Sequence, residues 1–196
     1  MITLFLVAVG YAAGSISAGI LVARAMGLGD PREGGSGNPG ATNLLRLGGR
    51  IAAGITLAVD CLKGVLPVVI AQALGLSDMA LAGVGLAAFI GHLYPVFFGF
   101  RGGKGIATGL GVMLAWSLPV GAGVLVTWAL VAAVSRISSL AALVSFALAP
   151  VYLWLLSQAP SLAAAAAVMA VLTAWRHRGN IQRIAKGTES RIGQRS

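Results

Sequence analysis

Charge is scarce in this sequence, and cysteine is nearly absent. Only 10% of the 196 residues are charged, and acids are the scarcest, with five Asp and Glu against fourteen Lys and Arg. Soluble domains carry about 25% charged residues, so this composition excludes a soluble enzyme. The single cysteine, Cys61, excludes a framework of disulfides within the chain and a cysteine-based metal site.

Apolar residues take the place of the missing charges. They make up 58% of the chain, and the mean hydropathy is +0.90. A domain of this size exposes much of its surface even when folded, so this many apolar residues cannot all be kept from water. The composition therefore predicts an integral membrane protein. The net charge of +9 then marks the orientation of loops or serves to bind lipid head groups or anionic substrates.

The basic residues are clustered, and the apolar stretches between the clusters have the length of membrane spans. A spanning helix needs about 20 apolar residues. On that measure the sequence predicts spans over Met1–Ala23, Ile51–Leu74, Met79–Phe98, Ile137–Leu156 and Leu162–Trp175. The first stretch has no basic segment before it, so we expect a retained span rather than a cleaved signal peptide.

The remaining apolar stretch, Ile106–Val134, is too long for one span and short for two. Pro119 lies in its middle, and proline disfavours a helical conformation of the residue before it. If the stretch forms two short helices, every basic cluster falls on one side of the membrane, as the enrichment of Lys and Arg in cytoplasmic loops requires. We therefore predict an all-α bundle of seven membrane helices, two of them short around Pro119, with the N-terminus outside and the C-terminus cytoplasmic. We expect residues 1–196 to form a single domain.

The loop between the first two predicted spans combines glycine with polar side chains. Glycines let the backbone turn so that several N–H groups face one concavity, which suits an oxyanion. Thr42 and Arg46 lie four residues apart and share a face if the segment after Gly40 is helical. A flexible turn is the alternative, but the uninterrupted run of donors favours an anion site. The candidate residues of this first loop are Gly35, Ser36, Gly37, Asn38, Gly40, Thr42, Asn43 and Arg46.

A second loop runs glycines and a cation into the predicted start of a helix. Helix N-termini carry unpaired N–H groups and a partial positive charge, which suits phosphate. The glycine spacing is not that of a Walker A loop, so ATP binding is not expected. The candidate residues of this second loop are Gly102, Gly103, Lys104, Gly105 and Thr108.

The C-terminal tail is the third basic element. A collar that binds anionic lipid and a site in which His177 and Asn180 face a bound anion are both open interpretations. The same holds for Asp60 and Lys63, which share a helix face inside a predicted span and either pair structurally or belong to a site. The Lys and Arg residues of the tail are Arg176, Arg178, Arg183, Lys186, Arg191 and Arg195.

Four segments, in order along the chain, resemble the signatures of a known enzyme family. Gly35–Arg46, Asp60–Pro67, Gly91–Thr108 and His177–Glu189 are similar to the motifs of the PlsY family, the bacterial acyl-phosphate:glycerol-3-phosphate acyltransferases. Four long motifs in the same order along the chain identify a family far more specifically than any one of them alone. The stretch 109–172 carries little of the signature.

The resemblance implies transfer of a fatty acyl group from acyl phosphate to the 1-hydroxyl of sn-glycerol 3-phosphate. The products would be lysophosphatidic acid and phosphate, in the first step of phospholipid synthesis. The resemblance also implies a monomeric, multi-pass protein of the bacterial inner membrane whose active site faces the cytoplasm. We expect the partners to be the two substrates, glycerol 3-phosphate and acyl phosphate, and membrane lipid, with no nucleic acid, no cofactor and no metal.

An acyl phosphate is already activated, so the enzyme must mainly hold two phosphates together, which at low dielectric demands cations such as Arg46 and Lys104. The hydroxyl proton goes either to a substrate phosphate or to His177. Neither histidine is followed by the aspartate of the His-x4-Asp motif of acyl-CoA-dependent enzymes. On the resemblance, the expected catalytic residues are Ser36, Asn38, Arg46, Lys104, His177 and Asn180. The expected substrate-binding residues are Gly35, Gly37, Gly40, Thr42, Asn43, Gly102, Gly103, Gly105 and Thr108.

Three other functions fit the sequence less well. An anion transporter would place its cations at mid-membrane and often shows inverted repeats, which this sequence lacks. A CDP-alcohol phosphotransferase needs several aspartates for metal, and the chain has three, widely spaced. A purely structural membrane protein would tolerate substitution of Arg46 or Lys104.

Overall fold

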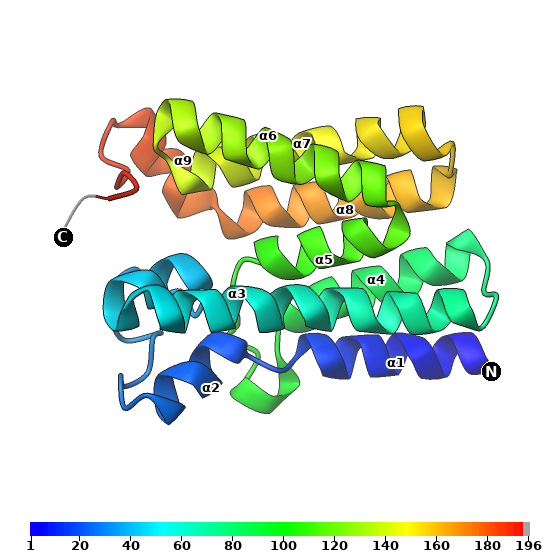
Figure 1. Ribbon diagram of the computed structural model, residues 1–196, viewed down its shortest axis with the longest axis horizontal. Helices are drawn as coiled ribbons and strands as arrows, with labels where there is room; N and C mark the ends of the chain where they lie inside the picture. The colour runs from blue at the N-terminus through cyan, green and yellow to red at the C-terminus, as the bar shows by residue number, and fades with distance from the viewer. Residues whose placement is uncertain (194–196) are drawn as a thin grey trace.

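Helices account for all the regular structure of residues 1–193, the part of the chain that the computed structural model describes. The longer helices lie side by side along one direction (Figure 1). Arg195 of the basic tail lies outside the described residues. The helices are α1 (Ile2–Gly14), α2 (Ala18–Ala25), α3 (Ala41–Ala73), α4 (Asp78–Leu93), the 3-10 turn η1 (Val96–Phe98), α5 (Ile106–Trp116), α6 (Leu118–Ser135), α7 (Ser138–Ser157), α8 (Pro160–Arg176) and α9 (Arg178–Ala185).

The first apolar stretch, for which the sequence predicts a span over Met1–Ala23, consists of two helices with a break between them. Residues 15–17 separate α1 from α2, and Ser17 is extended. The hydroxyl of Ser15 donates to the carbonyl of Tyr11 (2.8 Å), which satisfies an acceptor at the end of α1. The two helices together remain an apolar segment long enough to cross a membrane.

α3 begins earlier than the sequence predicts, at Ala41 instead of Ile51. Gly40 precedes it in an extended conformation, and Gly49 (φ 75°, ψ −166°) divides it into two helical parts. A positive φ of this kind favours glycine. The early start confirms that the segment after Gly40 is helical, so Arg46 stands on a short helix that leads into the long apolar one.

The apolar stretch around Pro119 is split, as the sequence predicts. α5 ends at Trp116 and α6 begins at Leu118. Ser117 between them is extended, and Pro119 stands in the first turn of α6, where its missing N–H costs nothing. Within residues 1–193, five apolar helical segments are long enough to cross a membrane, and α5 and α8 are shorter apolar helices. The number of spans and their orientation stay predictions.

The helices approach each other closely where glycine faces a neighbouring backbone. A Cβ at Gly14 would overlap the carbonyl of Ala88 in α4, and one at Gly64 would overlap the carbonyl of Thr108 in α5. Small residues allow this kind of close packing between membrane helices. α1 therefore packs against α4, and α3 packs against α5.

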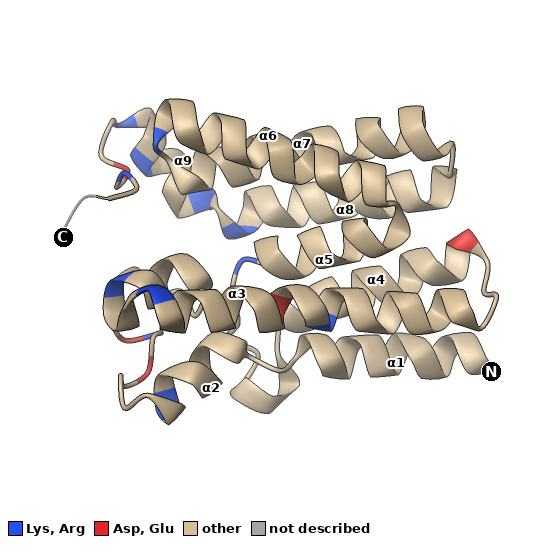
Figure 2. Cartoon of the chain, viewed as in Figure 1, with Lys and Arg blue, Asp and Glu red and all other residues tan. Residues whose placement is uncertain are grey.

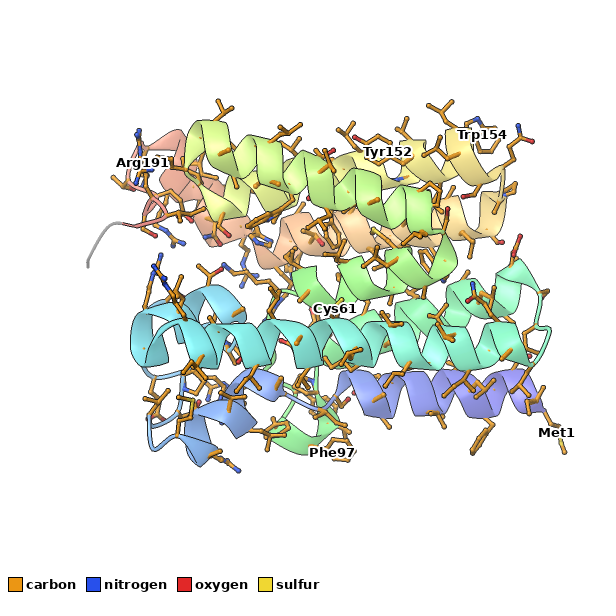
Figure 3. All side chains as sticks on the ribbon, viewed as in Figure 1. Met1, Cys61, Phe97, Tyr152, Trp154 and Arg191 are labelled. Carbon is orange, nitrogen blue, oxygen red and sulfur yellow. The ribbon has the colours of Figure 1, made fainter. Side chains whose placement is uncertain are left out.

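Apolar side chains cover the outside of the bundle, and basic side chains gather at one end of it. Trp154 lies on the outer surface toward the end where Met1 stands, while Arg191 lies at the opposite end (Figure 3). Most Lys and Arg residues cluster at this opposite end, where α2, the start of α3 and α9 lie (Figure 2). We call it the basic end, and it holds the candidate site.

Candidate active site

Asn43 shapes the first loop from inside. It lies in the first turn of α3 and is fully buried. Its side-chain oxygen accepts from the N–H of Ser36 (2.8 Å), and its nitrogen donates to the carbonyls of Pro31 and Gly34 (both 3.0 Å). These bonds use the amide within the loop, so Asn43 holds the backbone of the loop in place, and its contact with substrate stays a prediction.

The other polar side chains of the first loop are accessible. Ser36 and Thr42 are exposed, and Asn38 is partly exposed. The backbone turns at Gly35 and Gly37, whose φ angles are 59° and 69°. The loop therefore combines a turned backbone with accessible hydroxyl and amide groups.

The second loop is held on both sides of Gly103. The N–H of Gly103 donates to the carbonyl of His92 (3.2 Å). Arg176 of α8 donates to the carbonyl of Gly103 through Nε (3.1 Å) and to that of Gly102 through Nη2 (2.8 Å). Hydrogen bonds to α4 and α8 therefore hold the backbone that carries Lys104.

The last two candidates of the second loop lie deeper. Gly105 precedes α5 with a φ of 82°, a conformation that favours glycine. Thr108 is fully buried, and its hydroxyl lies 3.1 Å from Nδ1 of His92. The structure thus places the Thr108 side chain beneath the loop rather than at its surface.

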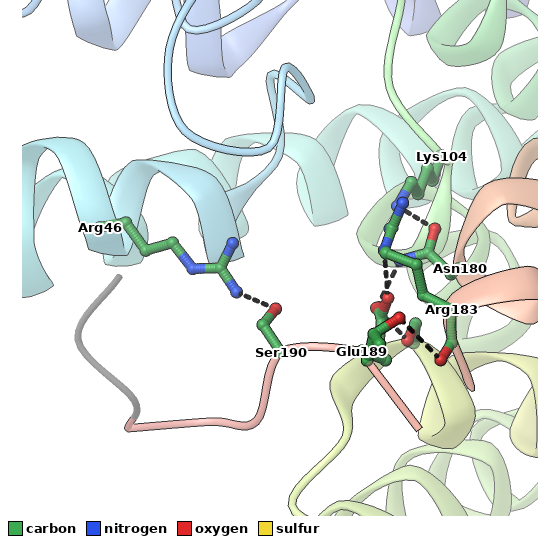
Figure 4. A network of polar contacts seen from close by, with 8 residues as sticks. Arg46, Lys104, Asn180, Arg183, Glu189 and Ser190 are labelled. Carbon is green, nitrogen blue, oxygen red and sulfur yellow. Dashed lines mark hydrogen bonds and ion pairs between the residues drawn. The ribbon is translucent and has the colours of Figure 1, made fainter. Parts of the chain in front are cut away.

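Lys104 reaches across to the C-terminal segment (Figure 4). Its Nζ donates to Oδ1 of Asn180 (2.6 Å). The nitrogen of the Asn180 amide donates to Glu189 (2.5 Å), whose carboxylate also accepts from Ser139 and Arg183 (both 2.7 Å). Asn180 is therefore oriented by a carboxylate so that its oxygen faces Lys104.

Arg46 reaches the same segment from the other side. Its Nη2 donates to Oγ of Ser190 (2.8 Å), the residue after Glu189 (Figure 4). The start of α3, the second loop and α9 thus meet at the basic end, and they bring Arg46, Lys104 and Asn180 into one network. Arg46 is exposed, so its guanidinium is accessible to an anionic ligand.

Burial sets the charge state of two site residues. It lowers the pKa of Lys104 to about 8, against the attraction of Glu189. Burial, together with the nearby charge of Lys104, lowers the pKa of His177 to about 4, so His177 is neutral at pH 7. Its Nδ1 lies 2.8 Å from the carbonyl of Thr173. A carbonyl can only accept, so Nδ1 carries the proton and Nε2 keeps its lone pair.

Glu189 ends the last of the four motifs, but the sequence interpretation gave it no role in the site, nor any to the pocket residues Arg101 and Arg176. Burial alone would raise the pKa of Glu189, but hydrogen bonds from Ser139, Asn180 and Arg183 outweigh that effect and lower it. The group is therefore an anion at pH 7 that organises cations and amides around it. Its signal was present in the sequence, because Glu189 is the only acid after Asp78 and stands inside a basic tail.

A pocket of about 230 Å³ lies between the two loops. Gly37 brings the first loop to its wall, and Gly102 brings the second. Arg101 and Arg176 supply positive charge. The residues that line it are Arg32, Gly37, Phe100, Arg101, Gly102 and Arg176. Both glycine loops therefore line one basic pocket, and Gly102 in its wall stands two residues before Lys104.

No group of three or more His, Cys, Asp or Glu side chains within residues 1–193 could hold a metal ion. The donors of the site are cations, hydroxyls and amides, which suit an anion. Independence of metal stays a prediction.

Both the sequence and the fold are similar to those of known acyltransferases. The family model for glycerol-3-phosphate acyltransferase matches residues 4–187. The crystal structure of PlsY, an integral membrane glycerol 3-phosphate acyltransferase, in its glycerol 3-phosphate form matches with a TM-score of 0.94 and 39% identity over 98% of this chain and 96% of that one. This chain belongs to the PlsY family of glycerol-3-phosphate acyltransferases.

Family members are similar over nearly their whole length. The glycerol-3-phosphate acyltransferase of Halorhodospira halophila is 57% identical over 193 residues, 98% of each chain. That of Hydrogenovibrio crunogenus is 55% identical over 183 residues, 93% of this chain and 88% of the relative. The lysophosphatidic acid form of PlsY matches with a TM-score of 0.91 and 38% identity over 98% of this chain and 96% of that one. PlsY membership confirms the resemblance and the all-helical membrane fold.

Proposed function

We propose that this chain transfers a fatty acyl group from acyl phosphate to the 1-hydroxyl of sn-glycerol 3-phosphate, with lysophosphatidic acid and inorganic phosphate as products. Membership of the PlsY family supports the acceptor. The solved PlsY structures are named for a glycerol 3-phosphate form and a lysophosphatidic acid form, which are an acceptor and a product of this kind. The acyl phosphate donor follows from the resemblance of the four motifs.

The observation that carries the proposal is the meeting of Arg46, Lys104 and Asn180 at the basic end, together with a basic pocket lined by both glycine loops. Donor and acceptor each carry a phosphate, and two such anions repel strongly in a partly dry site unless cations lie around them. Arg46 and Lys104 suit one phosphate, and Arg101 and Arg176 of the pocket suit the other. The site has the charge that two phosphorylated reactants need.

In the proposed step the 1-hydroxyl oxygen attacks the acyl carbon, and the bond from that carbon to the bridging phosphate oxygen breaks. Phosphate is a good leaving group, so no covalent intermediate with the enzyme is required. The rate then comes from positioning the two reactants and from cations that stabilise charge on the leaving phosphate. Ser36, Asn38 and Asn180 are the neutral groups that orient the reactants.

The leaving phosphate accepts the hydroxyl proton in this mechanism. A general base works best with a pKa near the working pH, and the pKa of His177 is lowered to about 4. Phosphate groups have a second pKa of about 6, so phosphate is the stronger base, while Nε2 of His177 orients the hydroxyl. Loss of a true general base costs about 100-fold or more. We therefore expect kcat of His177→Gln to fall by less than about tenfold, and a larger fall in a folded variant would make His177 the base.

We infer that the basic end faces the cytoplasm of a bacterial cell, because Lys and Arg are enriched in cytoplasmic loops. Glycerol 3-phosphate would then enter from the cytoplasm and acyl phosphate from the inner membrane. We propose that the protein acts as a monomer among membrane lipids, without cofactor or metal.

The donor is tested by incubating purified protein with palmitoyl phosphate and glycerol 3-phosphate. We expect lysophosphatidic acid and inorganic phosphate in equal amounts. Palmitoyl-CoA and palmitoyl-acyl carrier protein are the control donors, and neither should give product. Product from a thioester alone would contradict the donor assignment, and uptake of glycerol 3-phosphate into vesicles without product would favour a transporter.

A further inference from the structure

Three ionisable side chains outside the pocket are buried together below the second loop. Asp60 and Lys63 of α3 and His92 of α4 are 3%, 5% and 7% exposed. The fully buried hydroxyl of Thr108 in α5 joins them. We call these four residues the buried polar cluster. Ionisable groups inside a membrane protein are costly, and as a rule they mark function.

His92 stands at the centre of the buried polar cluster. Its Nδ1 lies 3.1 Å from Oγ1 of Thr108 and 3.6 Å from Oδ1 of Asp60. The same carboxylate oxygen lies 2.8 Å from Nζ of Lys63. None of the four lines the pocket between the loops. An effect of the cluster on a bound substrate would therefore pass through other residues.

The cluster supports the second loop from below. The carbonyl of His92 accepts from the N–H of Gly103 (3.2 Å). Nε2 of its ring faces Gly103 so closely that a Cβ there would overlap it. Lys104 follows directly and donates to Asn180 (2.6 Å). The His92 ring therefore lies directly against the backbone that carries Lys104.

The cluster also reaches toward the first loop. Nζ of Lys63 donates to the carbonyl of Ile16 (2.5 Å), in the break between α1 and α2. α2 in turn lies against the first loop, because a Cβ at Gly19 would overlap the carbonyl of Pro39. The carboxylate of Asp60 therefore contacts both Lys63, which bonds to the chain near the first loop, and His92, which lies below the second loop.

We propose that the buried polar cluster consists of positioning residues that fix Lys104 relative to the first loop during acyl transfer. The inference rests on the proposed function, in which Lys104 and Arg46, the last candidate of the first loop, hold one phosphate together. Stability alone does not account for the cluster, because buried ion pairs replaced by apolar side chains often leave a protein equally stable. The rate of transfer, in contrast, falls by about 100-fold when groups are misplaced by about 1 Å.

A double-mutant cycle between His92 and Gly103 tests the contact below the loop. Gly103→Ala puts a Cβ against Nε2 of His92, and we expect kcat to fall by about tenfold or more. His92→Asn keeps an amide near the position of Nδ1 but has no atom at that of Nε2. In this background Gly103→Ala should cost less than about threefold. Equal losses in the two backgrounds would overturn the proposal.

Asp60→Asn tests the shared carboxylate, and Asp78→Asn, at an exposed acid in the first turn of α4, is its control. We expect kcat of Asp60→Asn to fall by about tenfold while the KM for glycerol 3-phosphate stays within about twofold. Asp78→Asn should match the wild type. Thr108→Val is the milder variant if Asp60→Asn does not fold, and its kcat should fall in the same direction. A rise in KM at constant kcat would overturn the proposal.

All variants are assayed with palmitoyl phosphate, and their folding is followed by thermal unfolding in detergent. Absence of turnover by the wild-type protein would overturn the proposed function and this inference with it. Wild-type turnover with unchanged kcat in the folded variants would overturn the inference alone.

Discussion

Lys104, which we propose to hold a phosphate, is a partly buried cation, so we expect the reaction to be sensitive to alkaline pH. Its pKa is lowered to about 8, so the ammonium is protonated at pH 7 and loses its charge as the pH rises through 8. The pH dependence of kcat/KM reports the groups of the free enzyme. We therefore expect kcat/KM to fall above about pH 8, measured as steady-state rates corrected for spontaneous hydrolysis of the donor.

Lys104→Arg is the control for this pH profile. A guanidinium keeps its charge up to about pH 12, so any activity that the variant retains should show no alkaline limb near pH 8. The same limb in the variant would assign the titration to another group.

Residues whose type and motif suggest a function could be predicted as site residues from the sequence. Arg46, Lys104 and Asn180 stand in motifs rich in glycine or in polar donors, and their residue types alone suggest an anion. The topology predicted that their segments lie on one side of the membrane, but not which side chains bond to each other, because the bond between Arg46 and Ser190 joins residues 144 positions apart. Thr108 could be assigned to a motif, but its burial could not be predicted, because the spacing of a motif does not show how deep a side chain lies.

At the scale of helices, the backbones of α3 and α5 approach each other closely at Gly64. A Cβ there would overlap the carbonyl of Thr108, and overpacking of this kind costs about 1–3 kcal/mol. We expect Gly64→Ala to lower the midpoint of thermal unfolding in detergent. Gly54→Ala, in the same helix with open space around the added Cβ, should leave the midpoint unchanged or higher. Equal effects of the two substitutions would contradict this account of the packing.

The breaks between helices differ in how well they could be predicted. The break between α5 and α6 carries a local signal, because Pro119 and the distribution of charge both point to it. The break between α1 and α2 lies in an apolar run without proline, and Lys63 of another helix binds the carbonyl of Ile16 within it. Gly14, Ser15 and Ser17 at this break are a weaker local signal than a proline.

At the scale of the whole molecule, the two ends of the apolar bundle differ in charge. Basic side chains gather where α9 and the start of α3 lie, while the connection from α3 to α4 lies at the other end (Figures 1 and 2). The membrane class could be predicted from composition alone, because this many apolar residues have no place in water. The three distant segments of the site were expected on one side of the membrane, and the fold adds the contacts that join them.

The same distribution of charge predicts which end faces the cytoplasm. In a Cys61→Ala background, Asp78→Cys at the start of α4 and Lys186→Cys after α9 place one exposed thiol at each end. We expect a membrane-impermeant maleimide to label Asp78→Cys in right-side-out vesicles and Lys186→Cys only in inverted ones, because basic loops stay cytoplasmic. Retained acyltransferase activity is the control for native insertion. Labelling of Lys186→Cys from the outside would separate the site from cytoplasmic glycerol 3-phosphate, and the proposed route of that substrate would then be wrong.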